Sequence, residues 1–384
     1  MSVLIIEDST SYIGTQSSGS SCAYDPINKK IVVVYQYKWN TEGTANRGYA
    51  VVGTVGDTSV SWGTPVMFLD SYYSQYVNVV FDPASGKFVL SGYFNGCVVA
   101  TVVGESLMFG DAQLFDNIDA PYKKYLRCIA AGGKVIFAYK GTDAIHGSNV
   151  GKIIAGTVSG DTVFFGIQKV WYTSAIASTS FDIAYDTVNN KIAIFFREDS
   201  APRTVYTVLC DLLGTTITSN SPSSMGIAGY YMGFTICYNE DTGSFILAYV
   251  DAAVVGGWVV VGNVSGTSLS VGAHTLYNGE ISTAGYCRSA YNPRDKGVYI
   301  TFGDYYDSDI LKLVGFYQDG LTVSTTDVHK VNDFDTYEPS ITYDVDTDKL
   351  IVCATGGDGG ESVVIEVVPE LFWTEFEGQR EVIG

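Results

Sequence analysis

The sequence carries little positive charge. It has 22 lysines and arginines against 41 aspartates and glutamates in 384 residues, which gives a formal net charge of −19. A strongly anionic surface repels phosphate backbones, and no basic stretch is longer than Lys123-Lys124, so we expect no binding to nucleic acid. No apolar run approaches the ~18 residues that a membrane helix needs, so we also expect no membrane insertion.

Histidine and the sequence signatures of common enzymes are also scarce. The three histidines are His146, His274 and His329, and none belongs to a two-histidine metal motif. The chain has no Gly-x-Ser-x-Gly elbow and no phosphate-binding loop. The alternating aspartates of Asp344–Asp348 do not open a calcium loop, because Lys349 and Thr355 stand where that loop needs glycine and glutamate. We therefore predict a protein that is not an enzyme, with no catalytic residues, metal or cofactor. Carboxylates are plentiful, and sequence gives no distances between them, so a glycosidase pair stays open.

Cysteine is present in an odd number without metal-ligand spacing. The seven cysteines lie mainly in hydrophobic strand contexts, where a free cysteine behaves as a small buried apolar residue. We therefore expect no disulfides, and folding in a reducing cytoplasm.

One short phrase is repeated along the chain. It consists of a hydrophobic stretch ending in Tyr or Phe, an Asp or Asn, a turn, and a second hydrophobic run. The copies are residues 23–31, 80–88, 184–192, 237–245, 290–298 and 342–350, with a shortened copy at 129–135. Their anchors, from Asp25 to Asp344 and with Gly132 in the short copy, are 57, 50, 54, 53, 53 and 52 residues apart. A period in this range is typical of a propeller or another repeat array. The Asp or Asn begins a hairpin, where its side chain binds backbone N–H groups two residues on.

The remainder of each unit predicts four short antiparallel strands. A strand rich in β-branched and aromatic residues follows each turn, and a third strand closes on a glycine-bearing phrase such as Gly53–Gly63. We predict an all-β, seven-bladed propeller with four-stranded antiparallel blades, although six or eight blades stay possible because the third and fourth units are irregular. Residues 3–8 resemble an outer strand and are expected to complete the last blade, which closes the ring. The predicted organisation is one domain over residues 1–368, followed by a C-terminal extension over 369–384.

The loops on one face of such a ring vary in length and chemistry, and recognition tends to be placed on variable loops of a rigid scaffold. Aromatic rings and planar polar groups in these loops suit sugar binding. The candidate ligand-binding residues are Trp39, Arg47, Tyr72, Tyr73, Tyr122, Arg197, Arg203, Trp258, Tyr305, Tyr306 and Asp307. In contrast, Trp62 aligns with Phe109 and Phe165 and is assigned to packing.

Over residues 20–368, the Tyr-Asp hairpin phrase and the following Gly-x-Val-x-Gly phrase resemble the propeller repeats of tail-fibre and other virion structural proteins of tailed bacteriophages, notably marine and cyanobacterial ones. The resemblance implies a virion component, made in the host cytoplasm, that contacts other virion proteins or serves in receptor binding. It rests on structural residues. The chain departs from a fibre in that no long shaft segment precedes the first repeat.

The C-terminal extension contains an apolar cluster. Leu371, Phe372, Trp373 and Phe376 are too apolar for a free tail and are candidates for docking on a partner or on the propeller rim. The leading hypothesis is a non-enzymatic phage tail fibre or adhesin that binds a host-surface glycan or a neighbouring virion protein. The alternatives are a propeller glycoside hydrolase acting on host-envelope polysaccharide and a cellular protein-binding propeller scaffold.

Overall fold

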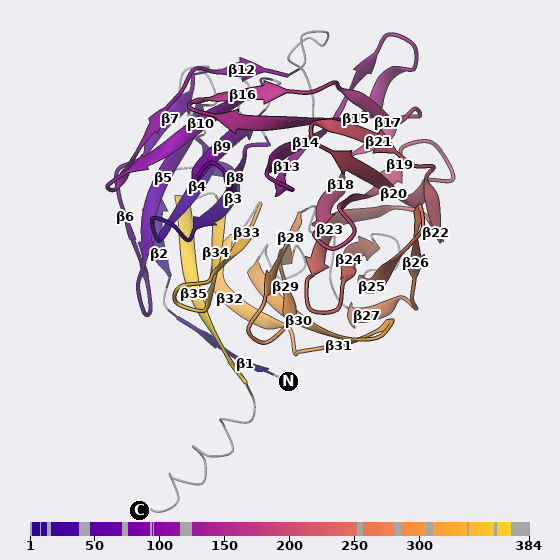
Figure 1. The fold of residues 1–384 in the computed structure, drawn as a ribbon. Coiled ribbons are helices and arrows are strands. Elements are labelled where there is room, and N and C mark those ends of the chain that lie inside the picture. The colour runs from indigo at the N-terminus through magenta and orange to yellow at the C-terminus, as the bar shows by residue number, and fades with distance from the viewer. Residues whose placement is uncertain are drawn as a thin grey trace, which may run out of the picture.

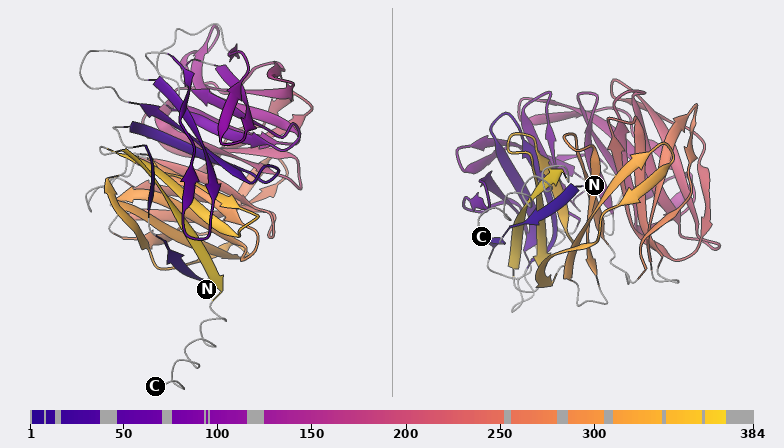
Figure 2. Two further views of the ribbon diagram at one scale, coloured as in Figure 1. Left: turned by 90° about the vertical axis from the view of Figure 1, so that its left-hand side faces the viewer. Right: turned by 90° about the horizontal axis from the view of Figure 1, so that it is seen from below.

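The computed structural model describes residues 2–7, 9–13, 17–37, 47–70, 76–92, 94, 96–115, 125–251, 256–279, 286–304, 310–335, 338–356 and 359–369. Within these ranges the strands form seven antiparallel sheets arranged as blades around a central channel (Figure 1). Views from the side show the blades standing next to one another, with their strands running between the two faces of the ring (Figure 2). The predicted seven-bladed β-propeller is therefore confirmed. No helix long and apolar enough to cross a membrane is found in the described part of the chain.

The strand bounds follow the repeat. Blade 1 contains β3 (Ser17–Asp25), β4 (Lys30–Tyr37), β5 (Arg47–Val55), β6 (Val60–Trp62) and β7 (Val66–Leu69). Blade 2 contains β8 (Asn78–Asp82), β9 (Lys87–Gly92), β10 (Gly96–Val103), β11 (Ser106–Phe109) and β12 (Gln113–Leu114). Blade 3 contains β13 (Leu126–Ala131), β14 (Lys134–Asp143), β15 (Gly147–Ser159), β16 (Thr162–Phe165) and β17 (Lys169–Tyr172). Blade 4 contains β18 (Ile176–Asp186), β19 (Lys191–Glu198), β20 (Thr204–Leu213), β21 (Thr216–Ser219) and β22 (Ser223–Ala228).

The other three blades repeat this order. Blade 5 contains β23 (Tyr231–Asn239), β24 (Ser244–Asp251), β25 (Gly256–Ser265), β26 (Ser268–Val271) and β27 (Thr275–Asn278). Blade 6 contains β28 (Cys287–Asn292), β29 (Gly297–Asp304), β30 (Ile310–Asp319), β31 (Thr322–Thr325) and β32 (His329–Asp335). Blade 7 contains β33 (Ser340–Asp344), β34 (Lys349–Gly356), β35 (Gly359–Pro369), β1 (Ser2–Ile6) and β2 (Thr10–Ile13). In every blade the last two segments pair with the two ends of the third strand, so together they occupy the fourth strand position.

The N-terminal segment closes the ring. β1 pairs antiparallel with β35, from Ser2 opposite Pro369 to Ile6 opposite Ile365. β2 pairs with the other end of β35, which extends the predicted closure beyond residue 8. The indigo β1 consequently lies beside the yellow β35 in Figure 1. The Tyr24 hydroxyl of blade 1 donates to Asp346 of blade 7 at 2.8 Å, which adds a bond between the first and last blades.

The repeated Asp and Asn residues begin the first hairpin of each blade, as predicted. Oδ1 of Asp25 accepts hydrogen bonds from the backbone N–H groups of Ile27 (2.8 Å) and Asn28 (3.1 Å). Asp186 and Asp344 make the same two bonds in their own blades. The short copy in blade 3 has no carboxylate at its turn. It uses Gly132 and Gly133 instead, whose positive φ angles of 55° and 69° form a two-residue turn.

A glycine follows the first of the two segments at the fourth strand position, as Gly166 follows β16. This glycine permits close contact between neighbouring blades. A Cβ atom on Gly166 would overlap the carbonyl oxygen of Thr215, which lies in the outer hairpin of the next blade. Gly110 and Gly272 have the same relation to the blades that follow them. Blade 4, which lacks the glycine, has Asn220 at this position, and its side chain turns back to bond Leu209 in its own blade at 3.0 Å.

The core lies between the blades. Seven clusters of buried apolar residues each join neighbouring sheets, as in the cluster where Val32 and Val34 of blade 1 pack on Phe88 of blade 2. Trp62 packs in such a cluster with its ring 5.3 Å from that of Tyr12, which confirms its assignment to packing. All seven cysteines are free thiols, and four of them are fully buried.

Candidate functional site

A ring of polar side chains surrounds the channel. Each blade carries a polar residue on its innermost strand, four positions before the last residue of that strand. These residues are Ser21, Asn78, Arg127, Asp182, Thr235, Arg288 and Ser340. We refer to these seven residues as the polar belt.

Several members of the polar belt bond the backbone of the next blade. The Ser21 hydroxyl accepts from the N–H of Val79 at 3.2 Å, and Asn78 donates to the carbonyl of Leu126 at 3.0 Å. β8 and β13 are edge strands, so their outward backbone groups have no partner within their own sheets. The side chains of Ser21 and Asn78 supply hydrogen bonds to these groups. The belt therefore joins consecutive blades near the axis of the ring.

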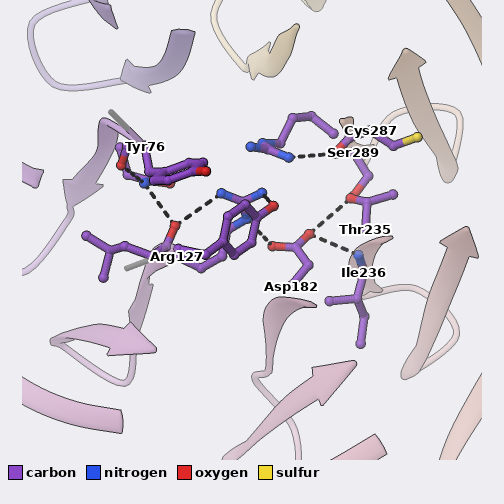
Figure 3. Close-up of polar contacts among 11 residues, drawn as sticks. Tyr76, Arg127, Asp182, Thr235, Ile236, Cys287 and Ser289 are labelled. Carbon is purple, nitrogen blue, oxygen red and sulfur yellow. Dashed lines mark hydrogen bonds and ion pairs between the residues drawn. The ribbon is translucent and has the colours of Figure 1, made fainter. Parts of the chain in front are cut away.

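A connected set of polar contacts within the belt runs from blade 3 to blade 6 (Figure 3). Nε of Arg127 lies 3.2 Å from Oδ1 of Asp182, and the two side chains are only 6% and 11% exposed. Oδ2 of Asp182 accepts from the Thr235 hydroxyl and from the N–H of Ile236, each at 3.1 Å. The Thr235 hydroxyl also lies 2.7 Å from that of Ser289. Both oxygens of the Asp182 carboxylate are thus occupied by protein groups.

Burial and neighbouring charge govern the electrostatics of the belt. The pKa of Arg127 falls to about 9, first because burial disfavours its charge and then because the charge of Arg288 repels it, while Asp182 and Glu338 act in the opposite direction. Burial also raises the pKa of Tyr286, whose hydroxyl bonds the carboxylate of Glu338. The ion pair of Arg127 with Asp182 joins blades 3 and 4 close to the channel.

Arg197 and Arg203 come together in the structure. Both flank the turn between β19 and β20 in blade 4. Arg197 follows Phe195 by two residues, so its side chain lies on the face of the sheet that packs against blade 5. The guanidinium of Arg203 lies over the ring of Tyr230, at 3.9 Å from the ring centre, and Tyr230 directly precedes the first strand of blade 5. We call Arg197, Arg203 and Tyr230 the arginine pair site.

Arg197 is buried without an ion-pair partner among the described residues. It is 8% exposed, and its Nε and Nη1 atoms have no hydrogen-bond partner in the described structure. Its pKa is lowered, first by burial and then by the charge of Arg203, with a weaker opposing effect of Asp199. Arg203 has a left-handed backbone, with φ of 63°, which is a strained conformation for a residue with a side chain.

The other predicted residues have different positions. Nε of Arg47 lies 2.8 Å from Oδ1 of Asp70 on the surface, so the protein itself supplies an ion-pair partner for this arginine. Trp258 does not lie in a loop as expected. It belongs to β25 and packs against the core cluster between blades 4 and 5, because the third strand begins earlier than the loop pattern indicated. The segment from Lys140 to Gly151 is an extended hairpin of β14 and β15.

Eleven of the predicted residues lie outside the described part of the chain. They are Trp39, Tyr72, Tyr73, Tyr122, Tyr305, Tyr306, Asp307, Leu371, Phe372, Trp373 and Phe376. Among the residues that the structure does describe, no three His, Cys, Asp or Glu side chains are grouped so as to hold a metal ion.

The polar belt was missed from the sequence although a signal exists. A polar residue recurs at one fixed position on the innermost strands of all seven blades, and aligning the copies by the end of that strand reveals it. Tyr230 was missed because it lies between two blades, where the repeat pattern gives no assignment.

Comparisons with known proteins identify the fold. No protein-family model matches the chain, and no curated protein matches it in sequence. A chain of the mitotic checkpoint complex is similar in structure, with a TM-score of 0.58 and 9% identity, covering 95% of each chain. An arginine-to-alanine mutant of AofleA from Arthrobotrys oligospora has a TM-score of 0.52 and 11% identity, covering 85% of this chain and 91% of the other. A putative 6-phosphogluconolactonase from Bacteroides fragilis has a TM-score of 0.54 and 8% identity, covering 83% and 85%. At such identities the shared feature is the propeller fold alone.

Proposed function

We propose that this chain is a non-enzymatic structural protein of a bacteriophage virion, a tail fibre or adhesin whose propeller binds a glycan on the host surface. The observation that carries the proposal is the arginine pair site on the face of the variable loops. Guanidinium groups bind and orient ligands but do not exchange protons at neutral pH, so they suit recognition better than acid–base catalysis.

The contacts of Asp182 at the channel also favour a non-enzymatic function. A glycosidase needs one carboxyl group that can give up a proton and a second that acts as base or nucleophile. Asp182 cannot serve as either while Arg127, Thr235 and Ile236 occupy its oxygens. The resemblance of the repeats to those of virion proteins supports a location in the phage particle. The chain would be made in the host cytoplasm and would contact other virion proteins.

Binding and particle assays together test this proposal. Purified protein is applied to immobilised host-envelope polysaccharides, and released reducing ends are measured in the same samples. We expect retention of the protein on polysaccharide without release of sugar, and antibodies to the chain should label purified phage particles. Turnover of the polysaccharide would make the protein a hydrolase, and unlabelled particles would remove the virion assignment.

A further inference from the structure

The arginine pair site contains two guanidinium groups that the described protein leaves without an ion-pair partner. Of the six described arginines, Arg47, Arg127 and Arg294 pair with aspartates, and Arg288 has no ion pair with a described residue but donates to the carbonyl of Cys287 at 2.7 Å. Among described residues, no carboxylate lies within ion-pair distance of Arg197 or Arg203, although the chain has 41 acidic residues against 22 basic ones. A shortage of acidic side chains therefore does not account for the two unpaired charges.

The contrast with Arg127 shows what is missing at Arg197. Both are buried, with 5% and 8% exposure, and both lie near a second arginine. Nε of Arg127 makes no hydrogen bond but lies 3.2 Å from Asp182 as an ion pair, whereas Nε and Nη1 of Arg197 have neither a hydrogen bond nor an ion-pair partner in the described structure. A buried cation without an ion-pair partner is unfavourable, and the weaker effect of Asp199 offsets this only in part, so an anion bound beside Arg197 and Arg203 would relieve both desolvation and mutual repulsion.

The chemistry of the site selects the kind of anion. A guanidinium presents a planar fork of N–H donors that matches a carboxylate or phosphate in a two-bond contact. Tyr230 is 53% exposed and adds an aromatic surface beside the two arginines, which suits the apolar face of a sugar ring. We propose that the arginine pair site binds the carboxylate of an acidic sugar in a surface glycan. This inference rests on the proposed function and names the ligand class for it.

The test uses the whole chain and defined probes. The probes are oligogalacturonate, a neutral oligosaccharide of equal length, galacturonate monomer, and inorganic phosphate. The variants are Arg197→Met and Arg203→Gln, and the control is Arg294→Met, which removes an exposed arginine from a first hairpin of blade 6, on the other face of the ring. Affinity is measured by calorimetry, and folding by the thermal transition without ligand.

We expect wild type and Arg294→Met to bind oligogalacturonate equally, and each site variant to bind it at least about tenfold more weakly, since charged hydrogen bonds are lost. Arg197→Met should melt no lower than wild type, because it removes an uncompensated buried charge. Arg203→Gln supplies an independent loss of binding if the first variant folds poorly.

Three outcomes would overturn the inference. Equal affinity for the neutral oligosaccharide would remove the acidic ligand, and phosphate binding as tight as oligogalacturonate would reassign the site to phosphate. Undiminished binding in both variants would move the glycan to another surface, with the adhesin proposal intact. The converse pattern, in which galacturonate binds through Arg197 but no host polysaccharide is retained, would support the site and contradict the adhesin.

Discussion

Removal of the Asp182 side chain tests the polar belt as a structural element. Asp182→Ala leaves Arg127 buried and charged, with Arg288 close enough to oppose that charge, and it frees the N–H of Ile236. Breaking a buried ion pair from one side costs about 3–5 kcal/mol. At ~2.1 cal/mol/K of unfolding entropy per residue, 384 residues give about 0.8 kcal/mol/K, so the thermal transition should fall by about 4–6 °C.

A double-mutant cycle identifies the cause of that loss. Arg127→Met combined with Asp182→Ala removes the stranded charge, so the double variant should be more stable than Asp182→Ala alone. Urea unfolding followed by tryptophan fluorescence gives the free energies, provided the slope with denaturant is unchanged. A loss below ~1 kcal/mol for Asp182→Ala, or a double variant no better than the single one, would refute the role of this ion pair.

Three further predictions concern closure, pH and thiols. Deleting residues 1–7 removes β1 and its buried Leu4, which should lower the melting temperature by about 4 °C or more and cause self-association through the uncovered edge of β35; an unchanged monomer in size-exclusion chromatography would contradict this. Burial lowers the pKa of His274, so stability should decrease as the pH falls below ~6.5, and His274→Gln should reduce that slope in unfolding curves from pH 7.5 to 5; equal slopes would show another group to be responsible. Burial raises the pKa of Cys210 and Cys287 to about 12, so a thiol reagent at pH 8 should modify them only after denaturation, whereas fast labelling of the native chain would show an open core.

The fold could be predicted from sequence because its signals are local. The Asp25 turn and its counterparts are short structures that depend on one side chain. Six such signals, together with the glycine turn of blade 3, occur at a near-constant spacing and determine the number of blades. Ring closure could be predicted for the same reason, since the N-terminal residues resemble an outer strand. The polar contacts of the belt, in contrast, join residues of neighbouring blades that lie far apart in the sequence. Arg127 and Asp182 are 55 residues apart and meet only after two blades pack.

The candidate site was predicted in part, because two of its residues lie close together in the sequence. Arg197 and Arg203 flank one turn, so their proximity follows from a hairpin of adjacent strands. Tyr230 completes the site from the connection to the next blade, and nothing in its neighbouring sequence indicates this. Trp258 shows the opposite error, because an aromatic residue in an expected loop proved to be part of a buried strand.

The pairing of β1 with β35 also has a consequence for biosynthesis. β1 has its partner more than 350 residues later in the sequence, so it stays unpaired until residue 369 has been translated. Six sheets can assemble from local segments during translation, but the seventh is completed only after β35 has been made, by a contact of very large sequence separation. We therefore expect closure to be the slow step of folding and truncated nascent chains to expose an apolar strand that chaperones can bind.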